Sequence, residues 1–309
     1  MAAKAAKIDT HNPPNVDDGG ERWGAHAMRT RSKQGNWDRV ITWNHKARTS
    51  GVRDSAFVAS LSDVFDTHSS ILPEWRTDMA ALILKCPDMD FMLLTKRAGN
   101  VEKILTGMFP EGTPPNVFIG LTVVTQEEAD RDIINLLRAK AACGFRTAFL
   151  SMEPLLEAVD LTKLNFMDGD AEIRMDALSA EAWVENSGSA SSYANASDGV
   201  ESLDWIIVGG ETGVNARPIH IDWVRGLRDQ CDAAGTSFLF KRWGNWFPFG
   251  EIDGQGNQNL VNNGKKSGLW HEWQDMPGFS AFLDKCQAGR SLDGRTWDGK
   301  PPALKMEMS

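Results

Sequence analysis

The chain has 309 residues, of which 41% are hydrophobic and 24% are charged, and its formal net charge is -9. This composition is ordinary for a folded globular protein, and the acidic balance argues against a general nucleic-acid binder, which usually carries a basic surface. No apolar run reaches the ~20 residues that span a bilayer, and Met1 to Lys7 lacks the apolar core of a signal peptide. We therefore expect a cytoplasmic protein.

The first part of the chain divides into an arm and a short helical layer. Residues 1–22 are polar and contain Asn-Pro-Pro-Asn and Asp-Asp-Gly-Gly, a composition that predicts a mobile arm. Trp23 to Ala47 carries three tryptophans among many basic residues and predicts a short helical layer. Packing against the body of the domain explains these tryptophans better than a binding role does.

A repeated strand–helix pattern follows. Helices are expected to begin near Pro73, Asn100, Thr125 and Asp222, and Thr125 to Glu128 reads as a capping box. The strand–helix units are about 25–35 residues long, as right-handed β–α–β crossovers require. The predicted fold is α/β, a partial TIM-like (β/α) barrel of about six parallel strands within residues 23–244. The expected strands are 56–60, 91–95, 116–121, 147–152, 205–209 and 237–241.

Two stretches break this pattern. Residues 161–203 include a low-complexity polar run from Asn186 to Ser197, and we expect an insert on the surface. Residues 245–309 are rich in Gly, Trp and charge with little periodicity. This tail is expected to wrap the outside of the barrel.

Polar residues cluster where the predicted strands end. Parallel strands place their carboxyl ends at one edge of the sheet, so we expect these clusters to meet around one cavity. The candidate ligand-binding residues are Ser60, Asp63, Thr95, Lys96, Arg97, Ser151, Glu153, Gly209, Gly210, Glu211, Lys241 and Trp243.

Each cluster has a functional and a structural interpretation. Lys96 and Arg97 suit an anion such as a carboxylate or phosphate, or form an ion-paired turn. Gly209-Gly210 allows close backbone approach to a cofactor or ribose, or makes a tight turn. Trp243 adds an aromatic face, and Arg217 is either another anion contact or part of a surface turn.

Metal and nucleophile motifs are absent from the sequence. No two of the cysteines at 86, 143, 231 and 286 are close enough for a CxxC pair, and each lies in or beside an apolar helical stretch. Buried, reduced thiols are expected. The histidines show no HxH or HExxH spacing, and there is no GxSxG or Walker motif.

Seven segments in order resemble the phage Gp-thirty-seven/sixty-eight family, radical-SAM-like phage proteins with a three-cysteine motif and no assigned function. The similarity covers nearly everything after residue 19. The segments are Gly19-Gly-Glu-Arg-Trp-Gly24, Ser60 to Phe65, Leu94 to Arg97, Ser151 to Leu155, Asp204 to Glu211, Phe240 to Gly244 and Ala288 to Trp297.

The resemblance implies a partial (β/α) barrel that binds S-adenosylmethionine and a 4Fe–4S cluster, with S-adenosylmethionine contacted between Gly209 and Glu211. Family members carry a C-x6-C-x2-C loop near the N-terminus, whereas Pro14 to Gly20 holds no cysteine and the first one is Cys86. The thiolate ligands of the cluster are therefore missing from this chain. Loss of the loop, a start upstream of Met1 and a missing coding segment are the three explanations.

Three functional hypotheses follow. The resemblance favours a radical-SAM enzyme that modifies nucleotides or nucleic acid for a phage in the host-cell cytoplasm, although the net charge does not support nucleic acid. The missing cysteines favour a cluster-free, catalytically silent barrel that binds a small ligand or a protein partner. A barrel enzyme that uses Glu153 and Glu211 as an acid/base pair comes last. A small-molecule ligand is expected and a membrane is not; the substrate and the oligomeric state stay open.

Overall fold

The computed structural model describes most of the chain, and the described residues belong to two compact units. Unit 1 comprises residues 1–121, 138–148 and 302–309, and unit 2 comprises residues 122–137 and 149–301. The described residues are 6–8, 27–58, 63–184, 201–248, 270–273, 279–283 and 288–302.

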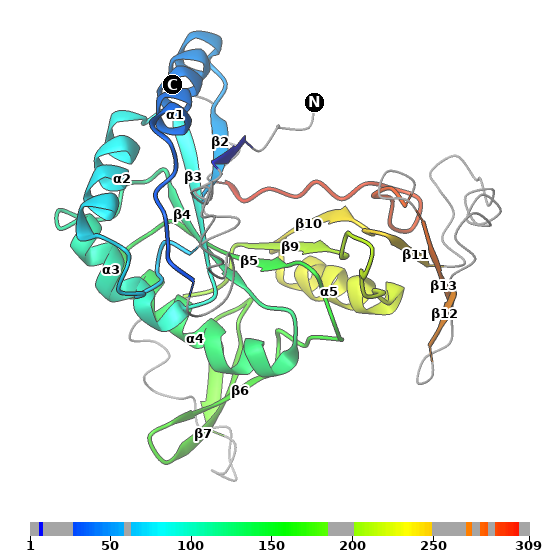
Figure 1. The fold of residues 1–309 in the computed structure, drawn as a ribbon. Helices are drawn as coiled ribbons and strands as arrows, with labels where there is room; N and C mark the ends of the chain where they lie inside the picture. The colour runs from blue at the N-terminus through cyan, green and yellow to red at the C-terminus, as the bar shows by residue number, and fades with distance from the viewer. Residues whose placement is uncertain are drawn as a thin grey trace. The chain divides into compact units, whose positions relative to one another are not determined.

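The main sheet has the strand order β1-β2-β3-β4-β5-β9-β10 (Figure 1). All its neighbouring pairs with a described register are parallel, and the six expected strands follow one another in chain order. The predicted α/β class and partial barrel are therefore confirmed, with β1 as an edge strand that the sequence had not indicated. The strands are β1 (Ala6–Ile8), β2 (Asp54–Val58), β3 (Met89–Thr95), β4 (Val117–Thr122), β5 (Thr147–Met152), β9 (Trp205–Gly209) and β10 (Ser237–Arg242).

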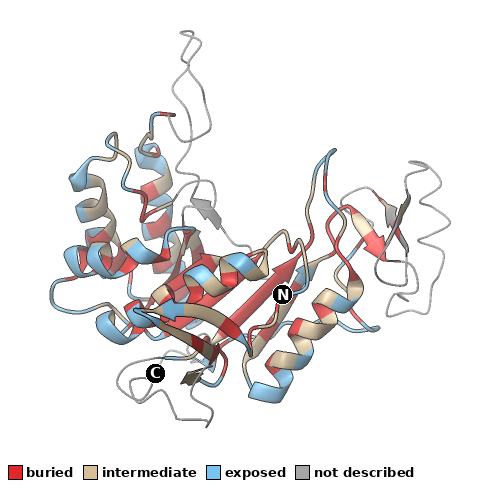
Figure 2. Cartoon of the chain, turned by 90° about the horizontal axis from the view of Figure 1, so that it is seen from below, coloured by how far each residue is buried: buried red, intermediate tan, exposed pale blue. Residues whose placement is uncertain are grey.

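Helices α1 (Gln34–Ser50), α2 (Pro73–Lys85) and α3 (Val101–Met108) belong to unit 1. Pro73 occupies the first turn of α2, where a missing backbone N–H costs nothing. A 3₁₀ turn, η1 (Ala98–Asn100), leads into α3. The central strands β3, β4, β5 and β9 are almost wholly buried, while the helices expose their outer faces (Figure 2). The helices therefore turn their apolar sides inward.

Side chains cap the first turns of two helices, and the predicted capping box at Thr125 is one of them. Helix α4 (Gln126–Cys143) begins where the Glu128 N–H donates to Thr125 Oγ1 at 3.3 Å, and Glu128 Oε2 accepts from the Val124 N–H at 2.8 Å. Gly144 follows the helix with φ +66°, a conformation that favours glycine. In α5 (Ile221–Ala234), the cap is His220, whose Nδ1 accepts from the Asp222 N–H at 3.1 Å.

Unit 2 also contains two small antiparallel sheets that the sequence analysis did not anticipate. Strands β6 (Leu164–Asp168), β7 (Ala171–Asp176) and β8 (Glu181–Val184) lie in the stretch expected to be an insert, and they bury Ile173 and Met175. The polar run from Asn186 to Ser197 lies outside the described residues.

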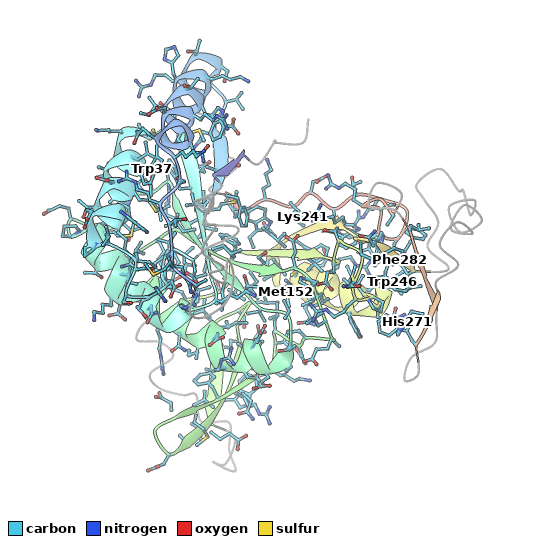
Figure 3. The ribbon with its side chains drawn as sticks, viewed as in Figure 1. Trp37, Met152, Lys241, Trp246, His271 and Phe282 are labelled. Atoms are coloured by element: carbon cyan, nitrogen blue, oxygen red, sulfur yellow. The ribbon has the colours of Figure 1, made fainter. Side chains whose placement is uncertain are left out.

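The second small sheet has the order β11-β13-β12, and aromatic rings hold it together. The ring of Trp246 lies 5.2 Å from that of Phe282 and 6.1 Å from that of His271 (Figure 3). Trp273 packs edge-on against Trp223 of α5 at 5.0 Å, so the small sheet is anchored on that helix. The strands are β11 (Trp246–Pro248), β12 (Trp270–Glu272) and β13 (Phe279–Phe282).

Residues 297–299 run along β10. The Phe240 N–H donates to the Trp297 carbonyl at 3.0 Å, and the Gly299 N–H donates to the Phe238 carbonyl at 2.9 Å. A Cβ at Gly299 would lie 2.3 Å from the Phe238 carbonyl oxygen, so only glycine permits this approach. This part of the tail therefore pairs with the last strand of the sheet.

A search of the described helices for a segment long and apolar enough to cross a membrane found none.

Candidate functional site

The predicted site residues form two groups, one in each unit. Asp63, Thr95, Lys96 and Arg97 belong to unit 1, and all the others except Ser60 belong to unit 2. Ser60 lies outside the described residues. Within each unit the contacts are explicit, whereas convergence of both groups on one cavity stays a prediction.

Asp63 is the centre of the group in unit 1. Its Oδ1 accepts from Thr95 Oγ1 at 2.8 Å and from the Phe65 N–H at 2.9 Å. Its Oδ2 accepts from Arg97 Nη1 at 2.8 Å and from the Lys96 N–H at 3.0 Å. With four donors on one nearly buried carboxylate, Asp63 is occupied by the protein itself and fixes the loop that follows β3.

Arg97 takes part in a wider ion-pair network. Its Nη2 lies 3.5 Å from Asp66 Oδ1, and Arg29 Nε lies 2.8 Å from Asp66 Oδ2. Burial alone would raise the pKa of Asp66, but the hydrogen bond from Arg29 and the nearby charges outweigh it and hold that pKa below its usual value. The geometry at Arg97 thus matches the ion-paired turn rather than an open anion site.

One charged pair of unit 2 lies at the ends of β5 and β10. Lys241 Nζ is 2.8 Å from Glu153 Oε2 and 3.0 Å from Oε1 (Figure 3 labels Lys241). The Glu153 side chain is 15% exposed and that of Lys241 45%. A Cβ at Gly209, on the intervening strand β9, would lie 3.1 Å from Glu153 Oε2. Glycine at position 209 therefore leaves room for the carboxylate. Ser151, in the neighbouring strand β5, is buried.

Gly210 makes room for the chain rather than for a ligand. A Cβ at Gly210 would lie 1.9 Å from the Trp243 carbonyl oxygen, and one at Gly244 would lie 2.1 Å from the Glu211 carbonyl oxygen. The Gly210 N–H also donates to the Arg242 carbonyl at 2.9 Å. The close approach expected of a cofactor or ribose at this glycine is made by the loop after β10.

Trp243 belongs to the core. It is 0% exposed, its ring lies 4.6 Å from that of Phe240, and its Nε1 donates to the Ser291 carbonyl at 2.7 Å. A fully buried ring offers no face to a ligand, so this residue anchors the end of β10 instead.

Glu211 is closed off by an arginine of its own loop. Its Oε2 accepts from the Arg217 N–H at 2.7 Å and from Nε at 2.8 Å, and Oε1 accepts from Nη2 at 3.1 Å. The Arg217 hydrogen bonds hold the pKa of Glu211 below its ordinary value. A carboxylate kept ionised in this way is a poor proton donor, which disfavours Glu211 as the acid of an acid/base pair with Glu153.

Sequence reasoning missed Asn245, which ties the loops together. It is buried, and its Oδ1 accepts from the Gly213 N–H at 2.8 Å while its Nδ2 donates to the Leu283 carbonyl at 2.7 Å. Its own N–H donates to the Glu211 carbonyl at 2.9 Å. Its place directly after Gly244, at the end of a polar cluster, is the sequence signal that could have identified it.

The described cysteines do not fit an iron–sulfur cluster. Cys86 follows α2, Cys143 ends α4 and Cys231 lies within α5; Cys86 and Cys231 are buried as predicted, whereas Cys143 is only half-buried. Burial raises the pKa of Cys231 to about 12 and also raises the pKa values of the other two thiols. Cluster ligation needs thiolates, which these surroundings disfavour. Within the described ranges no group of three or more His, Cys, Asp or Glu side chains could hold a metal ion, and Cys286 lies outside those ranges.

Comparisons with curated proteins and with solved structures gave no match. One family profile matches residues 2–301, and its description is "Protein of unknown function (DUF5131)". Since this match spans nearly the whole chain, the protein belongs to the DUF5131 family.

Proposed function

We propose that the chain is a cluster-free α/β protein that binds a small zwitterionic ligand, S-adenosylmethionine, beside Glu153 and Lys241. The observation that carries this proposal is the ion pair itself, which joins the ends of β5 and β10 with Gly209 between them. The choice of S-adenosylmethionine comes from the resemblance of the seven sequence segments.

The chemistry of the pair suits an amino-acid group. S-adenosylmethionine carries an ammonium and a carboxylate on adjacent carbons. Lys241 can exchange its bond to Glu153 for the ligand carboxylate, while Glu153 accepts the ligand ammonium. Both protein charges then stay paired throughout, so binding leaves no uncompensated charge beside the sheet.

Exposure favours this exchange. The Lys241 side chain is 45% exposed, so solvent and ligand reach its ammonium, whereas Glu153 is largely shielded. By contrast, Glu211 and Gly210 are already engaged with Arg217 and with the Trp243 carbonyl. We therefore move the expected contact from Gly209–Glu211 to the neighbouring pair.

A radical-SAM enzyme that acts on nucleotides or nucleic acid is the second proposal, and the order of the seven segments supports it. A bound 4Fe–4S cluster would supply the electron that cleaves S-adenosylmethionine. The described thiols do not fit that cluster, so we derive no step through it.

Isothermal titration with S-adenosylmethionine tests the first proposal. Lys241→Gln and Glu153→Gln should each weaken binding about tenfold, which corresponds to about 1.4 kcal/mol. Arg131→Gln is the matched control, because Arg131 forms an exposed pair with Asp132 on α4, and it should bind as the wild type does. Absence of binding to the wild type would refute the proposal.

A second titration distinguishes binding of the amino-acid group from binding of the nucleoside. 5′-Methylthioadenosine lacks the amino-acid group, so its affinity should be the same for the wild type and both pair variants. If the pair variants bound both ligands equally more weakly than the wild type does, the pair would shape the pocket instead of binding the amino-acid group.

A further inference from the structure

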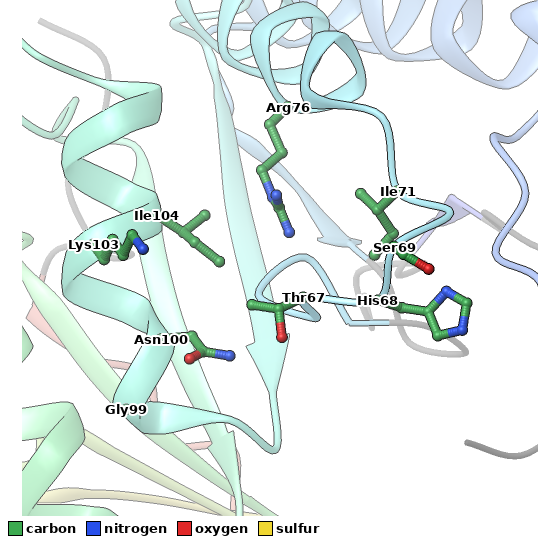
Figure 4. A pocket seen from close by; sticks show the side chains of 9 residues that line it. All are labelled: Thr67, His68, Ser69, Ile71, Arg76, Gly99, Asn100, Lys103 and Ile104. Carbon is green, nitrogen blue, oxygen red and sulfur yellow. The ribbon is translucent and has the colours of Figure 1, made fainter. Parts of the chain in front are cut away.

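Unit 1 contains a cavity of about 360 Å³ next to the first turns of α2 and α3 (Figure 4). This volume lies in the range of small-molecule sites, about 300–1,000 Å³. Its lining includes the cations Arg76 and Lys103, the hydroxyls of Thr67 and Ser69, and no carboxylate among the described residues. It shares no residue with the Glu153–Lys241 pair.

Arg76 is held rigidly at this cavity. Its Nε donates to the Val64 carbonyl at 3.1 Å and its Nη2 to the Asp66 carbonyl at 2.5 Å. No hydrogen bond to a described residue engages Nη1. The side chain extends from α2 toward the loop that carries Thr67 (Figure 4). A guanidinium fixed by two backbone acceptors keeps a free donor group at little entropic cost.

Among the described residues, no carboxylate lines the cavity beside these two cations. Asp63 and Asp66 lie near enough to Arg76 to act on its charge, but their carboxylate oxygens are already bonded to Arg97 and Arg29. In the described part of the chain, neither Arg76 nor Lys103 forms an ion pair with an acidic side chain. Two positive side chains therefore line one cavity, and the carboxylates near Arg76 are bonded to other arginines, an arrangement that attracts an anion.

Neutral donors and an apolar wall narrow the ligand class. Asn100 Nδ2 is already bonded to the Phe65 carbonyl at 2.9 Å, so the neutral donors are the hydroxyls of Thr67 and Ser69. Together with the two cations, these hydroxyls suit the three terminal oxygens of a phosphate better than the two of a carboxylate. Ile71 and Ile104 supply an apolar surface on the same cavity.

We propose that this cavity binds a phosphorylated small molecule, with the phosphate between Arg76 and Lys103 and an apolar group against Ile71 and Ile104. The proposal is independent of the S-adenosylmethionine site, since the two rest on different residues.

Phenyl phosphate is a suitable probe, with inorganic phosphate and benzoate for comparison, each followed by heteronuclear NMR shifts of the full chain. Phenyl phosphate should bind about tenfold more tightly than either of the others. Lys103→Gln should weaken the binding of phenyl phosphate about tenfold. Lys103→Arg, which keeps the positive charge, should bind it with about the wild-type affinity. Lys103 is exposed on α3, so its replacement spares the fold.

Lys85→Gln is the matched control, because it removes the same charge from the exposed end of α2 without lining the cavity. It should leave phenyl phosphate binding unchanged. No shifts with phenyl phosphate, equal binding of benzoate, or equal weakening by Lys85→Gln and Lys103→Gln would each overturn the proposal. Titration of Lys103→Gln with S-adenosylmethionine should give wild-type affinity, which keeps failure here distinct from failure at the other site.

Discussion

Lys241 and Glu153 lie 88 residues apart in the chain, yet the lysine Nζ is within 3.0 Å of both glutamate oxygens. The two partners differ in their access to water, because the lysine side chain is 45% exposed and the glutamate side chain 15%. Removing one partner therefore has a different consequence from removing the other.

Lys241→Gln should destabilise unit 2 more than Glu153→Gln does. The first change leaves a shielded carboxylate without its cation, at a cost of about 1–3 kcal/mol, whereas the second leaves a lysine that water can solvate. Urea unfolding of both single variants and the double variant measures the coupling, which we expect to be about 1 kcal/mol. Strictly additive effects would contradict a direct interaction.

Gly210→Ala should destabilise the chain by several kcal/mol. The added Cβ would lie 1.9 Å from the Trp243 carbonyl oxygen, and a backbone atom cannot move aside as a flexible side chain does. Gly226→Ala, in the middle of α5, is the control, since its Cβ meets nothing within 4 Å. That change should instead stabilise by about 0.5–1 kcal/mol. Thermal unfolding of both variants checks the contrast, and a mild effect at Gly210 would show that the two loops separate easily.

The Glu211–Arg217 pair should make stability depend on pH in the acid range. The folded-state pKa of Glu211 lies below its ordinary 4.5. The stabilisation of the folded state by ionised Glu211 is therefore complete above the unfolded-state pKa. It is lost as the pH falls through the lowered folded-state pKa. Since Arg217 is exposed, we expect less than about 1 kcal/mol.

Urea midpoints for the wild type, Glu211→Gln and Arg217→Gln test this sign. The urea midpoint of the wild type should be higher than those of both variants near neutral pH, and the three midpoints should converge at acid pH. A gap that persists or widens on acidification would mean that the carboxylate is not stabilised in its ionised form.

Anaerobic reconstitution of the chain with iron and sulfide should give no stable 4Fe–4S cluster. The described thiols have raised pKa values because they are buried, and a single further cysteine cannot supply the remaining ligands. Iron analysis and visible absorbance check this. Stoichiometric iron, with absorbance that bleaches on reduction, would revive the radical-SAM proposal.

The main elements were predictable because their signals are local. Strands β3 and β5 are short apolar runs, and α2 and α4 carry Pro73 and Gly144 at their ends. The small sheets were missed because their strands, such as β6 and β7, mix polar and apolar residues and are not continuous apolar runs like those of the main sheet. Their order depends on partners elsewhere, such as Trp273 against α5.

The candidate site was only half predictable. Sequence order places polar residues at strand ends, but it does not reveal which of them satisfy each other. Thr95 and Asp63 are 32 residues apart, and the two halves of the Gly210–Trp243 contact come from different strands. Only tertiary contacts separate a residue that is already partnered from one that a ligand can reach.

The pairing of residues 297–299 with β10 bears on how copies of this chain avoid one another. Strand β10 is last in the sheet order, and an uncovered last strand would offer its backbone to any other extended chain. Trp297 holds residues 297–299 in place, because the guanidinium carbons of Arg295 and Arg228 lie 3.5 Å and 5.3 Å from its ring centre. Residues 297–299 therefore cover the backbone edge of β10, which limits the pairing of that edge with another extended chain.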